Sequence, residues 1–113
     1  MFQRLLEKTT QRLGAARLPY MVIVGQAVLV YGEPRLTKDI DITLGVGIDK
    51  IGKVLHVISQ LKLKILIRDP IEFARKTMVI PASDQKSGIR IDFILSDSQY
   101  ERQAIQRANE EED

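Results

Sequence analysis

Two aspartates separated by a single apolar residue are the first feature of this sequence that could carry chemistry. Asp39 and Asp41 begin the run Asp39–Leu44, whose β-branched residues indicate a strand. Because strand side chains alternate between faces, both carboxylates would project from one face while Ile40 and Ile42 enter the core. Two negative charges this close repel each other. A divalent cation would relieve that repulsion, since Mg²⁺ prefers carboxylate and phosphate oxygens.

A third carboxylate lies in a similar setting. Asp92 stands in the middle of Ile89–Leu95, a run whose apolar residues alternate with a period of two and predict a strand. If this strand lies beside that of Asp39 and Asp41, three carboxylates converge. Three carboxylates could hold one or two Mg²⁺ or Mn²⁺ ions, which activate an attacking oxygen and stabilise leaving phosphate oxygens. Arg90 shares the face of Asp92 and could pair with it or contact a phosphate.

A glycine turn precedes the aspartates. The apolar run Tyr20–Val24 predicts a strand buried on both faces, and it leads directly into Gly25 and Gln26. We expect a short helix, Gln26–Tyr31, to follow. The first turn of a helix offers unpaired backbone N–H groups to an anion, and glycine lets the backbone approach closely. The sequence therefore predicts that Gly25 and Gln26 contact the phosphates of a nucleotide.

The rest of the chain predicts the elements that position these residues. The strand Leu63–Ile67 alternates with charged residues, which indicates a place near an edge of the sheet. We expect one α/β (α+β) domain, residues 1–113, with a mixed β-sheet flanked by helices. The other predicted elements are helices at Phe2–Leu13, Ile48–Leu61, Ile71–Lys76 and Ser98–Asn109, a strand at Met78–Ile80 and a polar turn at Ser83–Gly88.

This order of elements and motifs resembles the nucleotidyltransferase fold of the DNA polymerase β superfamily. The runs Val24–Val28 and Tyr31–Ile42 are similar to AbiEii-type and related small prokaryotic members, which often carry G-x-P-R-x-T-x-D-I-D. Twelve residues separate Gln26 from Asp39. That spacing falls within the superfamily pattern, hG[GS] followed by Dh[DE]h. Gln26 stands where glycine or serine is usual, unless Val24 and Gly25 fill the pair. The resemblance covers residues 20–95, most of the chain.

The resemblance implies an enzyme that moves a nucleoside monophosphate from a nucleoside triphosphate, ATP by preference, to an acceptor hydroxyl and releases pyrophosphate. Mg²⁺ or Mn²⁺ would be the cofactor. The acceptor could be a tRNA end, a protein hydroxyl or a small molecule. Longer relatives continue with further helices, so a second copy or a partner subunit could complete the site. The implied metal ligands and catalytic residues are Asp39, Asp41 and Asp92, and the implied nucleotide-binding residues are Gly25, Gln26, Arg35, Thr37 and Lys38.

Two alternatives use the same residues. A catalytically weak or inactive module could keep the fold and act as a nucleotide-binding sensor, an antitoxin-like partner or a subunit, which the unusual Gln26 favours. The three carboxylates could instead support metal-dependent hydrolysis of a phosphoester, which leaves no modified acceptor.

Composition excludes several other functions. The chain has no cysteine and one histidine, which excludes disulfides, zinc–thiolate sites, cysteine nucleophiles and multi-histidine metal sites. Hydrophobic residues make up 44% and charged residues 28%, as in ordinary globular proteins. No apolar run approaches the roughly 20 residues of a membrane span, so we expect a cytoplasmic protein without membrane association. Residues 1–97 carry 15 Lys and Arg against 10 Asp and Glu, a basic balance that suits a phosphate-bearing partner.

Overall fold

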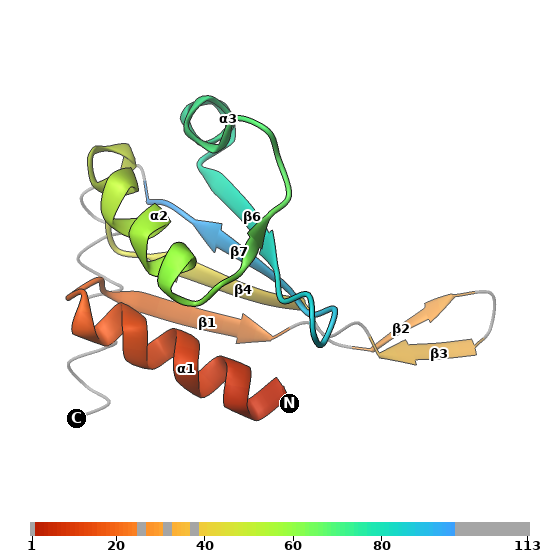
Figure 1. Ribbon diagram of the computed structural model, residues 1–113. Helices are drawn as coiled ribbons and strands as arrows, with labels where there is room; N and C mark the ends of the chain where they lie inside the picture. The colour runs from red at the N-terminus through yellow and green to blue at the C-terminus, as the bar shows by residue number, and fades with distance from the viewer. Residues whose placement is uncertain (1, 25–26, 31–32, 37–38, 97–113) are drawn as a thin grey trace.

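The computed structural model describes residues 2–24, 27–30, 33–36 and 39–96. In these ranges it contains a five-stranded mixed sheet of order β1-β4-β7-β6-β5, a separate two-stranded hairpin and helices packed on the sheet (Figure 1). The predicted α+β class with a mixed sheet is confirmed. The elements are α1 Phe2–Ala15, β1 Tyr20–Val24, β2 Ala27–Val30, β3 Glu33–Leu36, β4 Asp39–Leu44, the 3₁₀ turn η1 Ile48–Lys50, α2 Ile51–Gln60, β5 Lys64–Ile65, α3 Pro70–Thr77, β6 Val79–Ser83 and β7 Arg90–Ile94.

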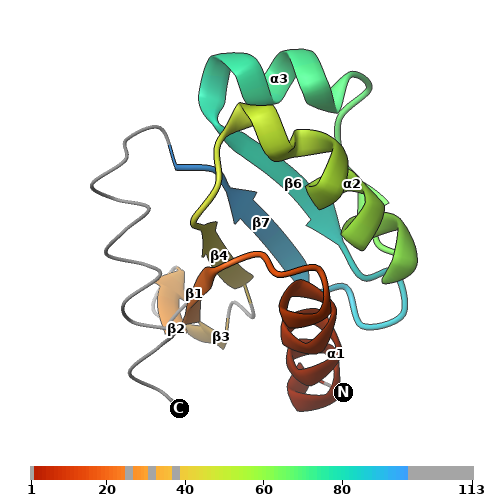
Figure 2. The same ribbon diagram turned by 90° about the vertical axis from the view of Figure 1, so that its left-hand side faces the viewer.

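The helices α1, α2 and α3 lie on the same face of the sheet (Figure 2). The apolar residues of β4 and β7 that face them are fully buried, which follows from strict alternation along each strand. The helices contribute the apolar side chains that are spaced three or four residues apart. The core side chains with no more than 1% exposure include Leu13, Ile40, Ile42, Leu44, Val54, Val57, Ile58, Ala74, Ile80, Ile91 and Phe93.

Most of the predicted elements are confirmed with small shifts of their ends. The helix predicted over Ile48–Leu61 is divided between η1 and α2, and the edge strand is the short β5, at one end of the sheet. Asp69 is the N-cap of α3, and its carboxylate accepts a hydrogen bond from the Glu72 N–H at 3.2 Å. The predicted helix Ser98–Asn109 lies outside the described residues.

The prediction that the Tyr20–Val24 strand is buried on both faces is wrong. Among the described strands, β1 pairs with β4 alone and lies at an edge of the sheet. Its side chains Met21 and Ile23 are 40% and 55% exposed. A continuous apolar run is typical of a central strand. Here the central strands β4 and β7 alternate charged and apolar residues, because their second face is not covered by the three helices.

The predicted helix Gln26–Tyr31 is also wrong where the structure describes it. Residues Ala27–Val30 form β2, which pairs antiparallel with β3 from Ala27↔Leu36 to Val30↔Glu33. A four-residue apolar run is too short for periodicity to separate strand from helix. The neighbouring segment decides the outcome, because it is extended and only two residues away in sequence, a common hairpin spacing.

Candidate functional site

The carboxylates of β4 and β7 lie on the sheet face opposite to the helices. The two strands are parallel and adjacent, with Asp41 in register with Asp92 and Asp39 in register with Arg90. The buried neighbours on either side of Asp41 point into the core, so the carboxylates must point away from it. The strand of Asp92 therefore lies beside the strand of Asp39 and Asp41. This arrangement is the condition under which the sequence predicts that the three carboxylates converge.

Arg90 forms an ion pair with Asp92 along the same strand. Its Nε donates a hydrogen bond to Asp92 Oδ1 at 2.9 Å. The Asp92 side chain is 22% exposed and the Arg90 side chain 51% exposed, so water screens much of the attraction. The hydrogen bond and the charge of Asp92 raise the pKa of the Arg90 guanidinium. Arg90 shares the face of Asp92, as predicted, and pairs with it.

The carboxyl group of Asp41 is perturbed by its surroundings. Burial raises the pKa of Asp41 above its ordinary value, and the charges of Asp92 and Asp39 raise it further. The Arg90 guanidinium lowers the pKa of Asp41, but this contribution is the smallest of the four. The negative charge of the three carboxylates is therefore incompletely neutralised, and Asp41 favours a proton or another cation close to it.

The carboxylate oxygens of this face suit a hard divalent cation. Their side-chain conformations, however, do not form a metal site. Carboxylate oxygens are the ligands that Mg²⁺ prefers. Among the described residues, no group of three or more His, Cys, Asp or Glu side chains is arranged to hold a metal ion. Asp92 directs Oδ1 at Arg90 instead. A metal ion shared with Asp41 would compete with Arg90 for Oδ1 of Asp92 or use the other carboxylate oxygen, and Mg²⁺ binding stays a prediction.

The residues predicted to bind the nucleotide are only partly described. Arg35 lies in β3, in register with Val28, in the hairpin that is separate from the five-stranded sheet. The other predicted nucleotide-binding residues, Gly25, Gln26, Thr37 and Lys38, lie outside the described residues. Their roles remain predictions from the sequence motif.

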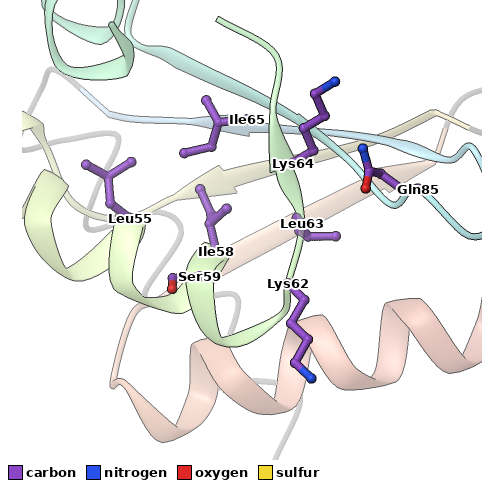
Figure 3. Close-up of a pocket in the computed structure, with 8 residues that line it drawn as sticks. All are labelled: Leu55, Ile58, Ser59, Lys62, Leu63, Lys64, Ile65 and Gln85. Atoms are coloured by element: carbon purple, nitrogen blue, oxygen red, sulfur yellow. The ribbon is translucent and has the colours of Figure 1, made fainter. Parts of the chain in front are cut away.

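Sequence reasoning missed a set of basic residues on the helical side of the molecule. Lys62 follows α2 and borders two recesses, one of which, of about 400 Å³, is drawn in Figure 3. There Leu55, Ile58 and Ile65 supply an apolar wall, while Lys62 extends towards α1. The spacing of Arg4, Lys8 and Arg12 was a readable signal, since residues four apart share one helix face.

Comparisons of the chain with protein-family models, with curated proteins and with solved structures find no match. In the ranges that the structure describes, no helix has the length and apolar character needed to cross a bilayer.

Proposed function

We propose that this chain is a Mg²⁺-dependent nucleotidyltransferase, which moves a nucleoside monophosphate from a nucleoside triphosphate to an acceptor hydroxyl. The observation that carries the proposal is that Asp41 is in register with Asp92 on the adjacent strand. Asp39 lies two residues before Asp41 on the same strand. The resemblance of the G-x-P-R-x-T-x-D-I-D segment to small nucleotidyltransferases supports it. ATP is the proposed nucleotide, and Mn²⁺ is a proposed substitute for Mg²⁺.

The transfer breaks one bond to phosphorus and forms another. The acceptor oxygen attacks the α-phosphorus, and the bond to the bridging oxygen breaks so that pyrophosphate leaves with the electron pair. The hydroxyl proton passes to a carboxylate, for which we propose Asp92. Mg²⁺ held by Asp39, Asp41 and Asp92 would neutralise phosphate charge and activate the acceptor oxygen. Gly25 and Gln26 would bind the phosphates, with Arg35, Thr37 and Lys38 close to the nucleotide.

A second candidate function is a binding module that does not turn over. The ion pair of Arg90 with Asp92 favours it, because the guanidinium then supplies the positive charge that a metal ion would supply in the enzyme. Such a module would bind a nucleotide or act as an antitoxin-like partner, and it would release no pyrophosphate.

Calorimetry with a non-hydrolysable ATP analogue tests the metal site. We expect binding that requires Mg²⁺, weakened about tenfold or more by Asp41→Asn because one ligand is lost. Asp49→Asn is the matched control, since it removes an exposed carboxylate from η1. No Mg²⁺-dependent binding at millimolar nucleotide would reject the transferase.

Pyrophosphate release separates the two candidates. The enzyme releases pyrophosphate with an RNA, protein or small-molecule acceptor, and Asp92→Asn abolishes the release. The binding module binds equally with Asp92 or Asn at this position, and neither form turns over. Formation of nucleoside monophosphate without a modified acceptor would indicate hydrolysis instead.

The proposal also includes a cytoplasmic location, where nucleoside triphosphates are abundant, and a second copy or a partner subunit that completes the acceptor side. Light scattering of the purified chain, with and without nucleotide, measures self-association. A monomer at all concentrations would exclude the second copy.

A further inference from the structure

Five basic side chains from three separate segments surround a groove on the helical side of the molecule. They line two adjoining recesses that share Lys8, Leu61 and Lys86, and the larger recess has a volume of about 550 Å³. We call this feature the basic groove. Its cations are Arg4, Lys8 and Arg12 of α1, Lys62 after α2, and Lys86 in the turn between β6 and β7.

Hydrogen bonds fix the backbone at the two positions outside α1. Lys62 adopts a left-handed conformation (φ 58°) at the end of α2, where its N–H donates to the Ser59 carbonyl at 3.0 Å. Figure 3 shows the Lys62 side chain extending towards α1. The turn that carries Lys86 is closed by Asp84, whose Oδ2 accepts hydrogen bonds from Ser87 N at 3.2 Å and Oγ at 2.6 Å. Both lysines are therefore presented by ordered turns.

The groove keeps its positive charge. All five basic residues are exposed, and within the described part of the chain none has a carboxylate ion-pair partner. Of the described residues that line the two recesses, Asp84 is the one with an acidic side chain. Its Oδ2 is already engaged by Ser87. The acidic residues Asp39, Asp41 and Asp92 lie instead on the opposite face of the sheet.

We propose that the basic groove binds the phosphodiester backbone of a nucleic acid. The α1 cations are four residues apart, which separates them by about 6 Å along the helix axis and makes a row rather than a point. Together with Lys62 and Lys86, this row forms an extended set of cations from three segments of the chain. Such a set matches an extended polyanion better than a single phosphate. The groove is concave, which suits a strand better than a membrane surface. Among the residues that the structure describes, those that line the groove include no aromatic side chain, so we expect binding that is electrostatic and tolerant of base sequence.

Fluorescence anisotropy of a labelled single-stranded RNA, and of the DNA of the same sequence, tests this proposal. The full chain is titrated between 50 and 200 mM salt without Mg²⁺ or nucleotide. If all five cations contact phosphates, the logarithm of the association constant falls with the logarithm of salt concentration at a slope of about −3.5. Because the assay contains no metal or nucleotide, its outcome is independent of whether the proposed transfer occurs.

A matched pair of double variants locates the binding surface. Lys8→Ala with Lys86→Ala should weaken binding about tenfold and reduce the slope by about 1.4. Lys50→Ala with Lys53→Ala removes the same charge from exposed positions outside the groove and should change affinity by less than about twofold. Thermal unfolding confirms that all variants are folded.

Three outcomes would overturn the proposal. Equal weakening by both double variants would mean that net charge alone attracts the nucleic acid. If neither the RNA nor the DNA bound at 50 mM salt, the basic groove would not be a nucleic-acid site. Poly-glutamate that binds as tightly as the RNA would indicate an acidic protein partner. Binding of RNA and DNA alike supports contact with the backbone, and a preference for RNA supports additional contact with the 2′-hydroxyls.

Discussion

Asp41 of β4 and Asp92 of β7 are register partners on adjacent parallel strands, and both carboxylates lie on the sheet face away from the helices. Neighbouring strands are about 4.8 Å apart, so the two negative charges are close enough to repel each other. Within the described strands, Arg90 is the one arginine in register with this group, and it pairs with Asp92 and leaves Asp41 less well compensated. The arrangement costs stability, and clustered carboxylates of this kind are more typical of a site than of a scaffold.

The first prediction concerns Asp41 and pH. Burial and neighbouring carboxylates raise the native pKa of Asp41 above the unfolded value of about 3.9, so the native state binds the proton more tightly. The stability of the wild-type chain therefore falls as pH rises through this window. We expect Asp41→Asn to raise the free energy of unfolding at pH 7 by about 0.2–1 kcal/mol, as for relief of a like-charge pair.

Thermal and urea unfolding between pH 3 and pH 8 measures this effect. The difference between Asp41→Asn and wild type should disappear as pH falls below about 3.9, where Asp41 is protonated even when unfolded. Asp49→Asn, at an exposed position in η1, serves as the control. Asp41→Asn that is less stable than wild type at pH 7 would contradict the prediction.

The second prediction concerns the ion pair of Arg90 and Asp92. A double-mutant cycle with Arg90→Ala and Asp92→Asn should give a coupling energy of about 0.5–1 kcal/mol, because the partners are partly exposed to water. Arg90→Ala alone should cost more than the double variant, since it leaves Asp92 unpaired beside Asp41. Urea denaturation at low and at 1 M salt measures the cycle, and the coupling should shrink at high salt. Additive effects of the two substitutions would mean that the pair contributes nothing.

The strands that carry the candidate site could be predicted from the sequence because their patterns are strong. In Asp39–Leu44 and Arg90–Ile94, apolar residues alternate with polar ones, so each strand fixes the face of its own carboxylates. Their pairing could only be stated as a condition, because it joins segments some 50 positions apart. The sequence also left open whether Arg90 pairs with Asp92 or contacts a phosphate, because that depends on the conformation of the Arg90 side chain.

Weak local patterns account for what the sequence did not predict. Ala27–Val30 is short enough to suit a helix or a strand, and its pairing with β3 determines the outcome. The apolar strand β1 lies at an edge because sheet order is a property of the whole topology. The α1 row of the basic groove was visible in the sequence, but Lys62 and Lys86 join it only through the folding of distant turns.

The third prediction concerns the core beneath the site. Phe93 is fully buried on the helical face of β7, while the next residue, Ile94, is half-buried on the opposite face. We expect Phe93→Ala to lower the free energy of unfolding by about 3–5 kcal/mol, because it leaves a cavity among the core side chains. Ile94→Ala, the control on the same strand, should cost less than half as much. Urea denaturation measures both, and equal losses would contradict the assignment of the two faces.

The fourth prediction concerns the bond that joins the ends of the two site strands. Ser96 is fully buried, and its Oγ donates a hydrogen bond to the Leu44 carbonyl at 2.5 Å, while its N–H donates to the Val46 carbonyl at 3.0 Å. These bonds connect the chain after β7 to the end of β4. Ser96→Ala removes the buried hydroxyl and should lower the free energy of unfolding by about 1–2 kcal/mol.

The control for the fourth prediction is Ser59→Ala, at an exposed position in α2, which should change stability by less than about 0.5 kcal/mol. Because the bond of Ser96 lies beyond the last register pairs of β4 and β7, its loss should also speed hydrogen exchange of the amides near Ile94 more than of those near Ile91. If Ser96→Ala were as stable as wild type with unchanged exchange, strand pairing alone would maintain the register that brings Asp41 beside Asp92.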